Sequence, residues 1–314
     1  MRRYRGLAYA PTTKKTYSSQ LNSYLNFCNA LGCVPYPVDD VMLCRYAAHL
    51  ALRLKYTSIP GYLNIVRILH MECGLDNPLN DNYFLRTVMR GIKREKGDSV
   101  KRTLPMTADI LLRIKRSLDF GKPKDVVLWC ASLVAFFGML RKSSLFPPTA
   151  GKFKADCYPT RGDIMRHSRG FMLKIKFSKT NQYKERTCDI PLPYFSDNPL
   201  CPATAIALLL TQSSLSKSPE APLFCLPNGP LTAEGFVTLL REKLRSLGLS
   251  EKEYTGHSFR RGGATAYFAA GVPGEIIKTI GDWKSQTYQI YCEISNNVKF
   301  EMVKPLHETI MSSV

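Results

Sequence analysis

Residues 255–294 read TGHSFRRGGATAYFAAGVPGEIIKTIGDWKSQTYQIYCEI. His257 and Arg260 are three residues apart at a predicted helix start, so their side chains share one face of the helix. Gly262, Gly263 and Ala264 follow, and such small residues allow another element to approach closely. The first half of this stretch therefore predicts a helix with a cationic face that packs tightly against its surroundings.

The second half of the stretch predicts a helix, a turn and a short helical segment. Gly271 ends the first helix, and Pro273 begins a second that runs to about Ile280. A tight turn over Gly281–Trp283 follows it. Tyr288 and Tyr291, three residues apart, then lie on the short segment.

These residue types suit the cleavage of a phosphodiester without a metal ion. The non-bridging oxygens gain negative charge in the transition state, and arginine is the donor that best matches them. A nucleophile must attack in line with the leaving oxygen, which needs a proton donor. The sequence contains no P-loop, HExxH or GxSxG motif and no carboxylate cluster for two metals. Two arginines, a histidine, a lysine and a tyrosine meet the requirement best.

The charge of the whole chain points to a polyanionic partner. The 314 residues carry 44 Lys and Arg against 25 Asp and Glu, a formal net charge of +19. Such a surplus repels itself in the folded state unless nucleic acid or an anionic membrane compensates it. The membrane is disfavoured, because the longest uncharged apolar run, residues 126–140, is shorter than the roughly 20 residues of a spanning helix.

Cysteine usage and the N-terminal residues predict an intracellular protein. The ten cysteines are scattered, and none forms a CxxC pair, so neither a zinc framework nor a disulfide scaffold is expected. The N-terminus is basic but has no apolar segment of a secretory signal. No metal or other cofactor is expected, and the location is nuclear if the host is eukaryotic.

The first hundred residues predict a compact helical domain. Four helices are expected, over residues 12–31, 41–54, 59–73 and 81–94, with Asp39 or Asp40 as the N-cap of the second and Thr57 or Ser58 as that of the third. The polar stretch 93–105 marks the boundary, so the domains are expected at 1–100 and 101–314. Around it lie seven basic residues that suit a strap across a phosphate backbone: Arg86, Arg90, Lys93, Arg94, Lys96, Lys101 and Arg102. The alternative is a solvated helix end.

The second domain mixes helices with a hairpin. Residues 171–177 and 186–192 alternate with period two and are separated by a polar turn, which predicts a β-hairpin whose tip carries Lys179, Lys184 and Arg186. Helices are expected over 107–120, 126–140, 202–211, 231–247, 256–271 and 273–280. The fold class is therefore mainly α with a small antiparallel β-sheet or hairpin (α+β).

Four motifs make the chain resemble the tyrosine recombinases, the phage-integrase type. They are G-M-L-R-K-S-S-L (138–145), F-S-K-T-N-Q (177–182), H-S-F-R (257–260) and G-D-W-K-S-Q-T-Y-Q-I-Y (281–291). The resemblance covers residues 105–300, and the first domain is similar to the family's core-binding domain, the part that clamps DNA. The last motif is most similar to the Crypton and DIRS recombinases of eukaryotic mobile elements.

The resemblance implies a role for each motif residue. Arg141 and Arg260 would clamp the scissile phosphate, and His257 would donate to it and assist proton transfer. Lys179 would protonate the leaving 5′ oxygen, and Tyr291 would form a 3′-phosphotyrosyl bond. The implied activity is site-specific recombination and integration of DNA, independent of metal and ATP.

Several assignments have alternatives. Arg141 follows an apolar helix and could simply end it, where a cation suits the helix dipole. Lys176 and Lys184 compete with Lys179 for the hairpin role, and Tyr288 competes with Tyr291 as the nucleophile. A lone His257 would more often be structural.

Two positions depart from the family pattern. Asp282 follows the turn glycine where most members have His or Trp, and we expect Trp283 to fill that role through its indole N–H. Ser144 stands where many members have an acidic residue, which would weaken the support of Arg141.

The expected partner is double-stranded DNA. By resemblance, a homotetramer would act on two DNA sites, with a monomer in the absence of DNA and the tail from Asn296 docked on a neighbouring subunit. The alternative for this tail is a helix packed on its own domain. Two other functions remain open: a domesticated, non-catalytic DNA-binding protein on the same scaffold, and a type IB topoisomerase.

Overall fold

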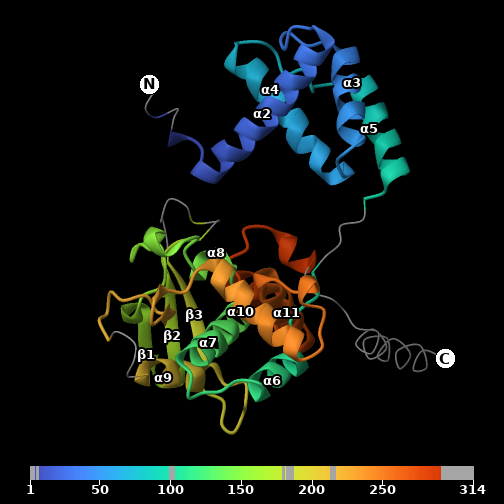
Figure 1. The fold of residues 1–314 in the computed structure, drawn as a ribbon. Coiled ribbons are helices and arrows are strands. Elements are labelled where there is room, and N and C mark those ends of the chain that lie inside the picture. The colour runs from blue at the N-terminus through green and yellow to red at the C-terminus, as the bar shows by residue number, and fades with distance from the viewer. Residues whose placement is uncertain are drawn as a thin grey trace, which may run out of the picture. The chain divides into compact units, whose positions relative to one another are not determined.

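The computed structural model describes residues 4, 7–98, 103–178, 181, 187–212 and 217–290. The chain divides into two compact units, Met1–Arg102 and Thr103–Val314 (Figure 1). The boundary expected after residue 100 lies beside this division. Along the described residues, no helix combines the length and the hydrophobicity that crossing a bilayer requires.

The first unit is built from the four predicted helices. They are α2 (Pro11–Leu31), α3 (Asp40–Ala51), α4 (Ile59–Glu72) and α5 (Tyr83–Lys96), with a 3₁₀ turn η1 (Tyr56–Ser58) before α4. Helix α2 packs on α4, and α3 packs on α5. Burial of Tyr24, Leu43, Tyr46 and Leu50, each fully inaccessible, joins the helices into one core.

Short-range hydrogen bonds set the helix ends of this unit. The Asp39 side chain accepts from the backbone N–H of Met42 at 2.7 Å, which confirms one of the two caps expected for α3. Asn82 caps α5, because its Oδ1 accepts a hydrogen bond from the N–H of Leu85 at 2.8 Å. Ser58, one of the two caps expected for α4, occupies its N-cap position, but its side chain makes no cap hydrogen bond.

The second unit is organised around α7 (Pro123–Phe137), in which residues 125–136 are all buried. Helix α7 lies between the sheet and the helices α10 and α11 (Figure 1). The other helices are α6 (Ala108–Arg116), α8 (Lys142–Leu145), α9 (Pro202–Thr211), α10 (Ala233–Ser246), α11 (Gly256–Ala269) and α12 (Gly274–Ile280). Short 3₁₀ turns are η2 (Ala150–Lys152), η3 (Arg161–Asp163), η4 (Glu251–Glu253) and η5 (Gln286–Ile290).

The predicted hairpin is part of a three-stranded antiparallel sheet. Strands β2 (Gly170–Ile175) and β3 (Cys188–Pro193) confirm the hairpin, and β1 (Ile164–His167) adds a third strand beside β2. A second, two-stranded sheet joins β4 (Cys225–Leu226) to β5 (Gly229–Pro230). Strand β1 escaped prediction because it is short and mostly exposed, and thus lacks an apolar alternation.

The C-terminal ends of α6 and α7 differ from the expectation. Helix α7 stops at Phe137, three residues before Leu140, because Met139 adopts a left-handed conformation with φ of 47°. Helix α6 ends at Arg116, four residues before Phe120, and Ser117 forms its C-cap. The mainly α fold with a small antiparallel sheet is confirmed.

Helix α11 packs closely against its neighbours, as its glycines predicted. A Cβ added at Gly262 would lie 1.8 Å from the carbonyl oxygen of Met106. One added at Gly263 would lie 2.2 Å from that of Phe136, in α7. These positions admit glycine alone, because backbone atoms occupy the space of any side chain.

Candidate active site

Arg260 is the most deeply buried charged residue of the predicted site, with 1% of its surface exposed. It lies on the first turns of α11, which a capping box at Thr255 and Ser258 begins. Its Nη1 donates to the carbonyl oxygens of Met139 and Gly281, the latter at 2.7 Å. The guanidinium therefore joins three segments that are far apart in the sequence.

Trp283 covers the same guanidinium. Its ring centroid lies 3.6 Å from Cζ of Arg260, a cation–π contact, and the indole is 6% exposed. A Cβ at Gly281 would fall 1.7 Å from the Trp283 ring, so the glycine makes room for it. The structure thus places Trp283 against Arg260, while its expected donation to a phosphate stays a prediction.

Arg141 follows the end of α7 at the N-cap position of α8. It lies four residues beyond Phe137, and the last turn of α7 contains no basic residue, which disfavours the alternative that it merely ends that helix. The side chain is half-buried. Among the described residues, none accepts a hydrogen bond from its guanidinium.

The pKa of the His257 imidazole shows that several arginines lie near it. Burial lowers the pKa of its imidazole, and the positive charges of Arg260, Arg141 and Arg261 lower that pKa further. The structure therefore brings Arg141, His257 and Arg260 together, although Arg141 is 116 residues before His257 in the chain. At neutral pH the lowered pKa leaves the imidazole uncharged, with one N–H to donate.

Arg261 is a member of this cluster that the sequence analysis missed. It is 4% exposed and acts on His257 together with the two predicted arginines. Its position next to Arg260 was visible, but adjacent helical residues point in different directions, which gave no reason to group them.

Two of the predicted catalytic residues, Lys179 and Tyr291, lie outside the described residues, as does the competing Lys184. The other competitors are described. Lys176 Nζ forms an ion pair with Asp163 Oδ2 at 2.7 Å, which engages it in a structural contact. Tyr288 is 7% exposed and packs with Trp283 and Ile277 in a small apolar cluster.

The two departures from the family pattern have distinct environments. The carboxylate of Asp282 accepts a hydrogen bond from Ser178 Oγ at 2.7 Å. Ser144 is buried within α8, with 3% of its surface exposed. Asp282 is therefore bound to the hairpin that leads toward Lys179.

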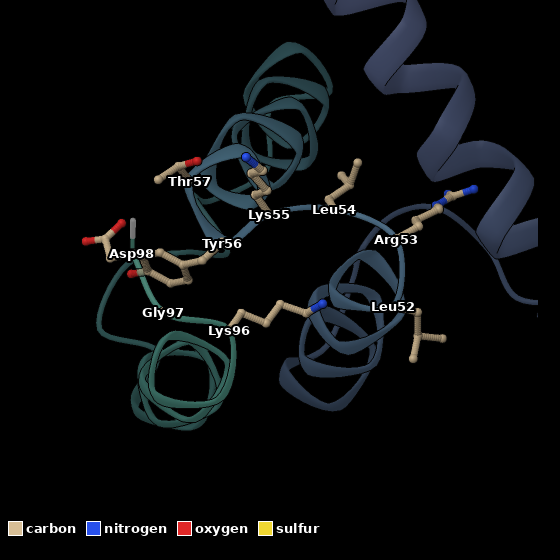
Figure 2. Close-up of a pocket in the computed structure, with 9 residues that line it drawn as sticks. All are labelled: Leu52, Arg53, Leu54, Lys55, Tyr56, Thr57, Lys96, Gly97 and Asp98. Carbon is tan, nitrogen blue, oxygen red and sulfur yellow. The ribbon is translucent and has the colours of Figure 1, made fainter. Parts of the chain in front are cut away.

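The basic residues predicted on α5 are all exposed: Arg86, Arg90, Lys93, Arg94 and Lys96. Lys93 pairs with Asp98 at 2.7 Å, a hydrogen bond that raises the lysine pKa, and its Nζ also lies 5.4 Å from the Tyr56 ring centroid. Lys96 lines an open hollow of about 370 Å³ between the end of α5 and residues 52–57 (Figure 2). Lys101 and Arg102 lie outside the described residues.

The arrangement suits binding of a phosphate group. Three arginines gather around a neutral imidazole, and hydrogen bonds and stacking hold one of them rigidly. Donors fixed before a reaction stabilise developing negative charge without having to reorganise. Within the described ranges, no group of three or more His, Cys, Asp and Glu side chains has the geometry to hold a metal ion.

Solved structures of DNA-processing enzymes share this architecture. A lambda integrase dimer bound to a COC′ core site superposes with a TM-score of 0.64, 15% identity and 93% coverage of both chains. XerH site-specific recombinase bound to palindromic difH gives 0.65, with 14% identity and coverage of 92% of this chain and 78% of the other. The Tn1549 transposon integrase in complex with transposon right end DNA gives 0.64, with 15% identity and coverage of 97% and 96%.

The chain has the fold of these integrases and recombinases. In sequence, it is 22% identical over 264 residues to an integrase/recombinase XerD homolog of Selenomonas ruminantium, which covers 82% of this chain and 74% of the relative. No protein-family model matches the chain. The relative and the shared fold together support the tyrosine recombinase (integrase) family that the four motifs indicate.

Proposed function

We propose that this chain is a site-specific DNA recombinase that cuts and rejoins DNA through a tyrosine. The observation that supports it best is the convergence of Arg141, Arg260 and Arg261 on His257. Such a cluster matches the charge that develops on a phosphodiester during cleavage. The similarity to an integrase/recombinase over most of the chain supports the same conclusion.

The reaction assigns one step to each side chain. The Tyr291 hydroxyl attacks the phosphorus, gives its proton to the uncharged imidazole of His257 and forms a 3′-phosphotyrosyl bond, while the bond to the 5′ oxygen breaks. Lys179 gives its proton to that leaving oxygen. Arg141 and Arg260 neutralise the non-bridging oxygens, and the neutral His257 donates a hydrogen bond to one of them. A 5′ hydroxyl reverses the same steps, so neither ATP nor a metal ion is required.

Double-stranded DNA is the proposed partner. The net charge of +19 and the exposed basic residues of α5 support contacts with many phosphates. Lambda integrase and XerH, two of the structural neighbours, are bound to DNA sites. We propose a homotetramer on two DNA sites, encoded by a mobile element of the Crypton or DIRS type and acting inside the cell, in the nucleus of a eukaryotic host.

A nicked DNA library provides the test without knowledge of the target site. Duplexes with a randomised core and a nick beside it release the 5′-hydroxyl fragment after cleavage, which traps the covalent intermediate. We expect wild-type protein to form denaturant-resistant adducts that converge on one sequence, with or without EDTA. Tyr291→Phe forms none, whereas the matched control Tyr288→Phe retains them.

The other outcomes separate the alternatives. Specific DNA binding without any adduct would favour the non-catalytic DNA-binding protein. Adducts without sequence preference, together with relaxation of supercoiled plasmid, would favour a type IB topoisomerase. Adducts that persist in Tyr291→Phe and vanish in Tyr288→Phe would reassign the nucleophile, and adducts that require a metal would overturn the mechanism.

A further inference from the structure

Asp282 occupies a backbone position that normally belongs to glycine. Its φ is 51°, in the left-handed region. Its N–H donates to the carbonyl of Thr279 and that of Trp283 donates to the carbonyl of Lys278, at 3.2 and 3.0 Å. These two bonds form a Schellman motif at the end of α12, in which glycine is the usual residue at this position. A residue with a side chain adopts this conformation at a cost in free energy, which a favourable contact of the side chain can offset.

The carboxylate of Asp282 makes such a contact with the hairpin. Asp282 Oδ2 accepts a hydrogen bond of 2.7 Å from Ser178 Oγ, across 104 residues of sequence. Ser178 is 7% exposed, so this charge-assisted bond is shielded from water. It ties the turn carrying Trp283 to the end of the segment that follows β2.

The hairpin side of this contact is itself held in place. Ser178 forms an isolated bridge with Asn181, whose Nδ2 donates to the carbonyl of Lys176 at 3.3 Å. Lys176 in turn pairs with Asp163 at 2.7 Å. Asp282 therefore binds a part of the hairpin that other contacts hold in place. Ser178 is the residue directly before Lys179 in the chain.

We propose that Asp282 is a positioning residue: through Ser178 it holds the hairpin segment leading to Lys179 in register with the turn that supports Arg260. This inference rests on the proposed function. Lys179 lies outside the described residues and enters only as the next residue along the chain. Because proton transfer depends steeply on distance, loss of the Asp282–Ser178 bond should impair protonation of the leaving oxygen more than attack by the tyrosine.

A substrate with a sulfur leaving atom isolates that step. A 5′-bridging phosphorothiolate expels a thiolate, which needs no proton, so a variant with a misplaced proton donor should still cleave it. The experiment measures single-turnover cleavage of the oxygen and sulfur forms of the site recovered from the library. Asp282→Gly removes the carboxylate and keeps the left-handed turn, and Ser178→Ala removes the donor without touching the turn.

We expect both variants to cleave the oxygen substrate about 100-fold more slowly than wild type, an effect typical of a small displacement in an active site. Both should cleave the sulfur substrate within about threefold of wild type, and the double variant should be no slower than either single one. Asp282→Asn and Ser178→Thr, which keep an acceptor and a hydroxyl, should largely restore cleavage of the oxygen substrate. Asp197→Gly is the matched control, because Asp197 has the same φ of 51°.

Failure of the inference differs from failure of the proposed function. If wild-type protein forms no adduct with the library, so that no site is recovered, the proposed function is wrong. If wild type cleaves both, the inference is overturned when Ser178→Ala and Asp282→Gly match wild type on the oxygen substrate. It is equally overturned when they are slowed by the same factor on both substrates.

Discussion

The guanidinium of Arg260 lies against the indole of Trp283, with Cζ 3.6 Å from the ring centroid. The same guanidinium binds the carbonyl oxygens of Met139 and Gly281. Met139 and Asp282, the residue after Gly281, both have positive φ. Arg260 therefore stabilises two strained turns, in addition to its proposed contact with the scissile phosphate, whereas Arg141 has no such structural contacts among the described residues.

This difference predicts distinct consequences for the two arginine variants. Arg260→Ala leaves two carbonyls without their donor and an indole without its partner, so the free energy of unfolding should fall by about 3 kcal/mol. Arg141→Ala should change it by less than about 1 kcal/mol, since its side chain is half-buried. Urea unfolding measures both. Neither variant should form adducts, but Arg141→Ala should keep its affinity for DNA; equal stability loss in the two would contradict the prediction.

The close packing of α11 predicts a large penalty at Gly263. An alanine Cβ would lie 2.2 Å from the carbonyl oxygen of Phe136, a backbone atom that cannot move aside easily. We expect Gly263→Ala to lower the free energy of unfolding by about 3 kcal/mol or more. In Gly91→Ala, at an open position of α5, the helix propensity of alanine should instead raise it by about 0.5–1 kcal/mol. Indistinguishable urea midpoints would refute the packing argument.

The ion pair of Lys176 predicts that this lysine stabilises the fold, whereas Lys179 is the proposed proton donor. Lys176→Ala removes the partner of a carboxylate that is 9% exposed, so stability should fall by about 1–2 kcal/mol. Lys179→Ala should reduce cleavage of the oxygen substrate by about 100-fold or more, with sulfur-substrate cleavage retained, if it is the proton donor. Urea unfolding and single-turnover cleavage, measured on both variants, distinguish the stabilising lysine from the proton donor. If only Lys176→Ala cleaved the oxygen substrate slowly and the sulfur substrate normally, Lys176 and not Lys179 would be the proton donor.

The lowered pKa of His257 predicts that stability falls in mild acid. Above the ordinary imidazole pKa of 6.5 the ring is neutral in both the folded and the unfolded chain. As the pH falls below it, the unfolded chain binds a proton that the folded chain still excludes, so the free energy of unfolding decreases. Between about pH 7.5 and about pH 5.5, wild type should lose more stability than His257→Gln.

Urea unfolding at the two pH values measures this difference. His167→Gln, which removes an exposed imidazole, is the control and should follow wild type. An acid-induced loss that is the same in wild type and His257→Gln would show that the arginines do not act on this ring as proposed.

The exposed arginines of α5 predict a specific salt dependence of DNA binding. Arg90 and Arg94 lie four residues apart on one face, so both can reach the phosphates of one groove edge. The double alanine variant should reduce the slope of log affinity against log salt by about 2, the value for two lost phosphate contacts. Lys15→Ala, on α2, controls for the loss of charge alone. A parallel shift of the affinity with an unchanged slope would exclude direct phosphate contacts by this pair.

Local signals in the sequence were sufficient for most of the helices. Caps such as Asp39, apolar periodicity and terminal glycines specify hydrogen bonds that close within one or two turns. The small residues of α11 likewise revealed a close approach before its partners, Met106 and Phe136, were known.

Other features of the structure could not be predicted from local sequence signals. The left-handed turn at Met139 that shortens α7, the strand β1 and the participation of Arg261 all lack a local pattern. The motifs indicated which residue types could cleave a phosphodiester, but not how the guanidiniums are held.

The sequence by itself therefore determined most of the helical framework, the charge, and Arg141, His257 and Arg260 as candidates for one site. Only the tertiary structure decided that Arg260 is locked between two turns and that Asp282 binds Ser178. The physical reason is that helix and cap energies depend on neighbours within a few residues. Contacts across about a hundred residues depend instead on how whole elements pack.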